Sequence, residues 1–225
     1  TVTLDLPSAL LAILASATGV TVTIIGDLNL GTATLRIVAS SIVVTGRTIG
    51  AGAIELLAGA TGDSIAEVLV TGSTLTADTI TLTATAAADE ASASVVVDGS
   101  DLTADSIELK ATSTATPASA AFVSASSSAS VAVIGASTLT ATAGAISIAS
   151  SSTATVDVES APTGLTGDTG VDAAIAIVDV ESIASTLVGE QTELAATGAI
   201  TISATSLADV TVVADASGIN AGGAI

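Results

Sequence analysis

One segment of this chain returns 27 residues later with the order of its side chains preserved. Residues 73–85 read STLTADTITLTAT, and residues 100–112 read SDLTADSIELKAT. Looser copies begin at Ser137 and near Gln191. A strand-like unit that recurs at a period of about 20–50 residues indicates a solenoid, in which each winding of the chain stacks on the one before it.

Apolar and polar residues alternate inside the repeated unit, as they do in a strand with one buried face. Ile80, Leu82 and Ala84 fall on one side of the segment, and four threonines fall on the other. Pairs such as Asp98-Gly99 stand between the alternating segments and are typical of turns. Alanine favours helix, but the frequent Thr, Val, Ile, Ser and Gly oppose it. The alternation therefore predicts strands.

Equivalent positions in successive copies carry aliphatic residues, which a stack of coils needs as columns along its axis. Tandem immunoglobulin-like sandwiches are the main alternative, but they usually fill a thicker core with aromatic residues, and Phe122 is the only aromatic here. We therefore predict an all-β fold, a parallel β-helix (β-solenoid) wound right-handed with irregular loop excursions. The predicted columns are Leu75, Leu102 and Leu139; Ile80, Ile107, Ile146 and Ile200; and Leu82, Leu109, Ile148 and Ile202.

The whole chain, 1–225, is predicted to form a single β-solenoid that is a segment of a longer chain. Residues 1–20 contain an uninterrupted apolar run at 9–15 and are interpreted as an end cap. Residues 21–72 are interpreted as shorter coils of about 20 residues, and residues 73–225 as longer coils with loops.

Loop excursions are expected near Pro117 and Pro162, because proline cannot donate a hydrogen bond to a neighbouring strand. The stretch from Leu139 to the last copy of the repeat is about twice as long as a coil, so we expect two windings there. The chain is expected to make roughly nine coils, which at about 4.8 Å per coil would give a rod about 43 Å long.

The charge of the chain excludes several functions. It carries 22 acidic residues against 3 basic ones, has a formal net charge of -19, and contains no Cys or His. Nucleic-acid binding requires cationic side chains for the phosphates and aromatic faces for stacking. The apolar run at 9–15 is far shorter than the roughly 20 residues that a membrane-spanning helix needs. We therefore expect no nucleic-acid partner and no membrane insertion.

Asp78 and Asp105 are the candidate metal ligands. They occupy equivalent positions in neighbouring coils, so stacking would bring the two carboxylates to about 5 Å from each other. Such a pair repels unless a cation or backbone donors intervene, and calcium is the cation that prefers oxygen ligands. The alternative is that both are turn residues with side chains in water, and Thr142 at the next equivalent position favours this alternative.

The other acidic clusters raise the question of an enzyme. Carbohydrate-cleaving enzymes use grouped carboxylates, but they also need a cationic or imidazole side chain, and Lys110 is the only basic residue after Arg47. We interpret the clusters as solvated and predict a protein without catalytic residues or a required cofactor. The clusters are Asp89 with Glu90, Asp179 with Glu181, and Asp168 with Asp172.

The threonines at 79–85 form a rank like those on flat ice-binding solenoids. Ice binding requires the same rank in every coil, and the next coil places Glu108 and Lys110 there. We therefore interpret the threonines as ordinary exposed strand residues. Phe122 is interpreted as a core or loop-packing residue.

Two runs carry a resemblance to a known group of proteins. Residues 198–205 read GAITISAT, residues 144–150 read GAISIAS, and Thr-Leu-Thr-Ala recurs. From about residue 26 onward the chain resembles the β-helical repeat region of large bacterial surface proteins, the filamentous haemagglutinin-like and giant repetitive adhesins. The resemblance implies an extracellular, cell-surface location. The secretion domain and the calcium-binding Gly-Gly-x-Gly-x-Asp nonapeptides of that group are not seen in this sequence, so neither is carried over.

These observations favour a non-catalytic, extracellular structural or adhesive β-solenoid that acts as a stiff stalk. Its expected partners are neighbouring repeats or other copies, joined end to end, and a host or surface receptor. The alternative is a self-assembling subunit of a fibre or sheath, because bare strand edges invite addition of further strands. A carbohydrate-active or ice-binding solenoid is the third hypothesis.

Overall fold

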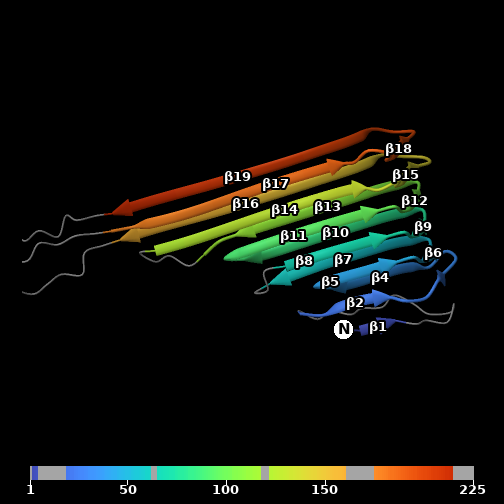
Figure 1. The fold of residues 1–225 in the computed structure, drawn as a ribbon, viewed down its shortest axis with the longest axis horizontal. Helices are drawn as coiled ribbons and strands as arrows, with labels where there is room; N and C mark the ends of the chain where they lie inside the picture. Colours follow the sequence, from blue (N-terminus) through green and yellow to red (C-terminus); the bar gives the residue numbers. More distant parts are fainter. Residues whose placement is uncertain (1, 5–18, 62–64, 118–121, 161–174, 215–225) are drawn as a thin grey trace, which may run out of the picture.

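The computed structural model describes residues 2–4, 19–61, 65–117, 122–160 and 175–214. Every regular element in these residues is a β-strand, and all pairings between strands are parallel, so the prediction of an all-β parallel solenoid is confirmed. The strands form three sheets, which we name long sheet 1, the short sheet and long sheet 2 (Figure 1).

Each coil contributes one strand to each sheet in turn. Long sheet 1 contains β1 (Val2–Leu4), β2 (Thr21–Ile24), β5 (Ser41–Thr45), β8 (Ile65–Thr71), β11 (Glu90–Asp98), β14 (Phe122–Ile134) and β17 (Ile177–Val188). The short sheet contains β3 (Leu28–Asn29), β6 (Thr48–Gly50), β9 (Thr74–Thr76), β12 (Asp101–Ala104), β15 (Thr138–Ala141) and β18 (Glu193–Ala196). Long sheet 2 contains β4 (Thr34–Ala39), β7 (Ala53–Thr61), β10 (Thr79–Ala88), β13 (Ser106–Ala115), β16 (Ile146–Ser160) and β19 (Ile200–Ala214).

The aliphatic columns predicted from the repeat are present in the strand register. Leu102 pairs with Leu75 on one side and with Leu139 on the other. The isoleucine column and the mixed leucine and isoleucine column run through β10, β13, β16 and β19 in the same way. Alternate residues of these strands point inward, and below the last coil the column residues are almost fully buried.

The number of coils differs from the sequence-based estimate of about nine. The short sheet has six strands, so the described residues make six complete coils, and β1 adds one strand beneath β2. Leu139 pairs directly with Leu194, which means that the stretch expected to hold two windings holds one. The prediction was wrong because the coils keep lengthening toward the C-terminal end, so that one long winding fills the stretch that was expected to hold two.

The coils lengthen from the N-terminal to the C-terminal end, and they do so on one side only. Strands of the short sheet stay at 2–4 residues, while long sheet 2 grows from 6 residues in β4 to 15 in β16 and β19. In Figure 1 the strands are aligned at the right, beside the short sheet, and end progressively further to the left. Pro117 follows β13 at this lengthening side, while Pro162 lies outside the described residues.

A glycine and a serine fix the turn from long sheet 1 into the short sheet. Gly72 and Gly99 have φ values of 55° and 54°, a region that side-chain-bearing residues adopt only with strain. The next residue is a buried serine in both coils. The backbone N–H of Ser73 donates to the hydroxyl of Ser100 (3.1 Å), and that of Ser100 donates to Ser137 (3.2 Å). This hydroxyl ladder ties each corner to the next coil.

The interior has two apolar clusters separated by buried serines. The larger cluster lies beside the short sheet and contains mostly Ile, Leu, Val and Ala. The smaller one lies at the far side of the long coils, around Val123, Val156 and Val158. Between the clusters a row of hydroxyl groups crosses repeatedly from one long sheet to the other. The row consists of Ser113, Ser127, Ser152, Ser182 and Ser206.

The serine row has a defined direction. Ser152 donates to the hydroxyl of Ser127 (2.9 Å), and because a hydroxyl has one hydrogen, the 2.9 Å contact between Ser152 and Ser182 uses the hydrogen of Ser182. At one end of the row Ser206 donates to Ser182, whose carbonyl oxygen (2.6 Å) is nearer than its hydroxyl (3.0 Å). At the other end Ser113 donates to the carbonyl of Ala91. Satisfying each hydroxyl in this way makes a buried polar row tolerable.

Most of the segment interpreted as an end cap, including the apolar run at 9–15, lies outside the described residues. Strand β1 is described and extends long sheet 1 by pairing with β2. Among the residues that the structure describes, no helix has the length and apolar character to cross a membrane.

Candidate functional site

The two candidate metal ligands are stacked as the repeat predicts. Asp78 lies just before β10 and Asp105 just before β13, and the backbone N–H of Asp105 donates to the carbonyl of Asp78 (2.9 Å). Both side chains are exposed. One carboxylate oxygen of Asp105 accepts a hydrogen bond from the hydroxyl of Thr142 in the following coil (2.7 Å). This carboxylate therefore already has a structural partner.

A metal ion is best held by several converging ligands. In the described part of the chain, no group of three or more Asp, Glu, His or Cys side chains is arranged to hold one. A calcium ion at Asp78 and Asp105 would depend on two protein carboxylates and on water for the rest of its six to eight ligands. Calcium at this pair stays a prediction, which titration calorimetry tests directly.

The other acidic clusters are solvent-facing where they are described. Asp89 and Glu90 lie at the start of β11, and both are exposed. Asp179 and Glu181 alternate with inward-facing residues on β17 and point outward. The cluster of Asp168 and Asp172 lies outside the described residues.

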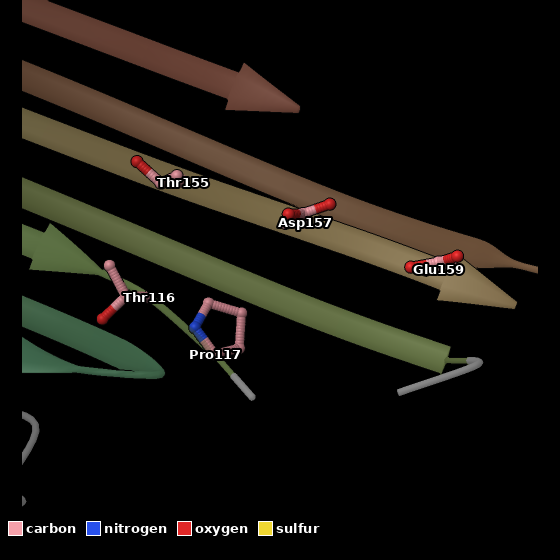
Figure 2. Close-up of a pocket in the computed structure, with 5 residues that line it drawn as sticks. All are labelled: Thr116, Pro117, Thr155, Asp157 and Glu159. Carbon is pink, nitrogen blue, oxygen red and sulfur yellow. The ribbon is translucent and has the colours of Figure 1, made fainter. Parts of the chain in front are cut away.

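A hollow at the lengthening side brings together residues that the sequence did not single out. Its volume is about 350 Å³, and it lies where β13 has ended and β16 runs on (Figure 2). In Figure 2, Asp157 and Glu159 follow one another along β16, and Thr116 and Pro117 lie on the chain that leaves β13. Thr155 completes the lining. The alternation of β16 could have identified this outward acidic pair.

The chemistry available in this hollow is limited. Asp157 and Glu159 are two residues apart on one strand, so their Cα atoms are separated by about 6.7 Å and both side chains leave the same face. Paired carboxylates in glycosidases flank the bond that they cleave, whereas these two lie side by side and are exposed. None of the five lining residues is cationic.

The outer face of long sheet 2 does not present a continuous threonine plane. Thr81 and Thr83 pair in register with Glu108 and Lys110, as the repeat predicts. One outward column stays hydroxyl-rich through four coils, namely Thr85, Thr112, Ser151 and Thr205. A single such column is much narrower than a flat ice-binding face.

The interpretation of Phe122 as a core or loop-packing residue is wrong. Phe122 is the first residue of β14, and its side chain is 67% exposed. It faces outward because the inward positions of β14 begin with Val123. Its register partner Ile177 on β17 is also exposed, so the two apolar side chains lie next to each other at the outer rim of long sheet 1.

The C-terminal end of the solenoid is the most conspicuous surface of the described residues. Ile202 and Val212 continue inward columns of β16, yet they are 49% and 46% exposed. Their register partners Ile148 and Val158 are fully buried. Strands β17, β18 and β19 each have a neighbour on one side only. We call these three edges and the inward side chains of the last coil the open end.

Comparison of the chain with protein-family models, with curated proteins and with solved structures found no match.

Proposed function

We propose that this chain is a non-catalytic structural β-solenoid that acts as a stiff stalk in an extracellular surface protein. The observation that carries the proposal is the continuity of the three parallel sheets through six coils. Backbone hydrogen bonds in these sheets run along the stacking axis and are reinforced by the aliphatic columns and the corner serines. Bending such a rod requires stretching hydrogen bonds in at least one sheet.

The surface chemistry supports a spacer rather than a catalyst. The grouped carboxylates of the described residues are exposed, and the hollow beside Asp157 and Glu159 has no cationic lining residue. A net charge of -19 keeps a strand-rich protein soluble and opposes random association. We therefore propose that the chain works without a cofactor.

The extracellular location rests on the resemblance of the repeats to those of filamentous haemagglutinin-like and giant repetitive adhesins. The absence of cysteine is compatible with secretion. A host or surface receptor is the partner that this resemblance implies, and it would bind the outer faces or rims of the coils.

A subunit that polymerises head to tail into a fibre receives less support. Such a fibre needs two complementary open ends. The inward residues Leu35 and Ile37 of the first coil are fully buried, and β4 has 6 residues against 15 in β19. The two ends therefore match neither in exposure nor in strand length.

Surface labelling of intact cells tests the stalk proposal. An antibody raised against the folded chain should label unpermeabilised cells of the producing organism, and the chain should resist protease concentrations that digest an unfolded protein of equal length. Labelling that appears only after permeabilisation would contradict the extracellular location.

A second assay tests the absence of catalysis. The purified chain is incubated with a panel of soluble polysaccharides, with the variant Asp157→Asn/Glu159→Gln as the matched control. We expect no release of reducing ends by either protein. Release by the unmodified chain that disappears in the variant would favour a carbohydrate-active solenoid instead.

A further inference from the structure

We propose that the outer face of long sheet 1 binds the same face of a second copy, so that two solenoids lie side by side as a weak dimer. The contact face consists of the outward side chains of β8, β11, β14 and β17. It points sideways from the stack and is formed by several successive coils, so it does not arise from the position of the first or last coil. This inference goes beyond the stalk proposal and does not rest on it.

One outward column on long sheet 1 breaks the alternation of apolar and polar residues in every coil from β5 to β17. In β11, for example, Val96 points outward between the buried residues Val95 and Val97. The strand register joins the equivalent residues of five coils into a continuous apolar column. It consists of Val43, Leu69, Val96, Ala132 and Leu187.

The outer face of long sheet 2 differs at this point. Its column that begins with Val38 and Leu57 continues with Thr83 and Lys110, so the apolar character is lost after two coils. An outward strand position therefore has no need of an apolar residue to keep the coils stacked. Contiguous apolar surface that is bordered by polar residues marks an interaction site.

Serines make the rest of the contact face flat. Ile65 and Ile183 are 61% and 47% exposed and lie in one column, in which Ser92 and Ser128 stand between them. Small side chains allow two sheets to stack at the usual distance of about 10 Å. The outward serines of β11 and β14 are Ser92, Ser94, Ser124, Ser126, Ser128 and Ser130.

A two-fold axis gives this face a pairing that both copies satisfy. An axis parallel to the strands, between β11 and β14, places β11 over β14 of the second copy and β8 over β17. The strands of the two copies are then aligned, as in a β-sandwich. Leu69 faces Leu187 of the second copy, and Ile65 faces Ile183. The apolar residues therefore meet one another.

The same axis keeps negative charges apart. Every outward carboxylate of β8 and β11 faces an uncharged residue of the second copy, and two of the three face a serine, whose hydroxyl can donate to a carboxylate. The pairs are Glu67 with Ser185, Glu90 with Ser126, and Asp98 with Ile134. The face is thus complementary to itself although the chain is acidic.

The area of the face fits a weak dimer. Strand β11 has 9 residues, so at about 3.3 Å per residue it is about 30 Å long, and four strands at about 4.8 Å span about 19 Å. The footprint is about 600 Å² per copy, or about 1,200 Å² in total, which is the lower limit for specific interfaces. We therefore expect a dissociation constant in the micromolar range.

Charge opposes the association and gives it a diagnostic salt dependence. Each copy carries a net charge of -19. Salt screens this repulsion, and the Debye length falls from about 30 Å at 0.01 M to about 10 Å at 0.1 M. The dimer should therefore tighten as salt is added, whereas an interface held by ion pairs would weaken.

Analytical ultracentrifugation of the full chain tests the proposal. Over protein concentrations of about 1–100 μM in about 0.15 M salt, where the Debye length is about 8 Å, we expect a monomer–dimer equilibrium. Leu69→Glu places a carboxylate in the apolar column and should weaken dimerisation at least about 30-fold. Leu57→Glu makes the same change on the outer face of long sheet 2 and should retain the dimer. Circular dichroism establishes whether each variant is folded.

A second variant keeps the test decisive if Leu69→Glu disturbs the fold. Ser94→Tyr adds bulk without charge where the two faces meet at Ser130 of the second copy, and it should weaken the dimer about tenfold because the faces no longer fit. Thr83→Tyr, on the outer face of long sheet 2 in the same coil, is the matched control.

Crosslinking tests the orientation of the two copies, because the chain contains no cysteine. Leu69→Cys and Leu187→Cys chains are mixed and treated with a bifunctional maleimide that spans about 10 Å, the distance between stacked sheets. We expect the mixture to crosslink and neither variant to crosslink alone. The two copies of residue 69 lie on opposite sides of the axis, as far apart along the rod as β8 is from β17.

Three results would overturn the proposal: a monomer at every concentration, a dimer that Leu69→Glu and Ser94→Tyr leave unchanged, or crosslinking of Leu69→Cys with itself. A monomer would leave the stalk proposal intact, while failure of surface labelling would leave the dimer intact.

Discussion

The narrow and the wide ends of this solenoid are built from the same pattern and differ in what covers them. Leu35 and Ile37 in the first coil are fully buried, whereas Ile200 and Ile202 at register-related positions of the last coil are about half exposed. Strands β4 and β19 are both edge strands of long sheet 2, so the burial of an inward residue depends on what covers the end of the stack and not on residue type alone.

Within the coils, the part beside the short sheet and the part that only the long coils contain also differ in how their interiors are filled. The part beside the short sheet contains large aliphatic residues such as Ile54 and Leu56. In the part that the long coils add, Ser113, Ser127 and Ser152 take inward positions and satisfy one another. Small residues keep two long sheets close together without requiring aromatic side chains.

The largest expected change in the free energy of unfolding comes from truncating one residue of an aliphatic column. Ile107→Ala in the middle of the stack should lower the free energy of unfolding by about 3 kcal/mol, because a buried isoleucine leaves a cavity. Ile200→Ala in the same column should cost about 1 kcal/mol, since its side chain is already half exposed. Urea denaturation measures both, and equal losses would contradict the contrast.

The serine row provides the next largest effect. Ser127→Ala removes the hydroxyl that donates to Ser113, while Ser152 keeps the backbone carbonyl of Ser127 as an acceptor (2.8 Å). The variant should cost about 1 kcal/mol, because one buried hydroxyl loses its donor. Ser206→Ala, at the exposed start of the same row, should cost less than about 0.5 kcal/mol. The comparison is made by denaturant titration, and it fails if the two variants are equally stable.

A smaller effect of opposite sign is expected at the narrow end. Arg47 occupies the corner position that Ser73 and Ser100 fill in later coils, and its buried Nε has no hydrogen-bond partner in the described structure. Arg47→Ser should extend the hydroxyl ladder to the equivalent corner at Asp27 and raise the free energy of unfolding by about 0.5–1 kcal/mol. Thermal denaturation measures the change, with Arg47→Ala, which adds no hydroxyl, as the control. A variant less stable than this control would refute the argument.

The smallest effect concerns the ion pair of Arg36 and Glu55. Arg36 Nε lies 3.2 Å from a carboxylate oxygen of Glu55, and both side chains are well exposed on long sheet 2. Glu55→Gln should cost less than about 0.5 kcal/mol, and the loss should vanish in high salt. A salt-independent loss above about 1 kcal/mol would show that the narrow end depends on charge as well as on its aliphatic columns.

The sequence predicted the fold and the register because both depend on matched residues. Leu75, Leu102 and Leu139, with their counterparts on long sheet 2, are apolar at a recognisable period, and a stack requires such columns. The stacking of Asp78 and Asp105 followed from the same alignment. Neither result required knowledge of coil length.

The alternation of apolar and polar residues could not predict coil length or the serine row. Period-two alternation marks a strand but does not say where it ends, so the 15 residues of β19 had no signal separating them from two shorter strands. Ser127 and Ser152 are polar by type, and alternation assigns polar residues to the outside unless their partners across the interior are known. The hollow beside Asp157 arises from unequal strand lengths and was missed for the same reason.

The constant short sheet makes this molecule a scaffold that tolerates growth at one rim. Residues added in the connection between a strand of long sheet 2 and the following strand of long sheet 1 leave the corner glycines and serines undisturbed, as the step from β13 to β16 illustrates. A peptide grafted there in any one coil would project from the rim at a height set by that coil. Because the coils lengthen toward the C-terminal end, a graft in each successive coil would lie farther from the short sheet than the graft in the coil before it.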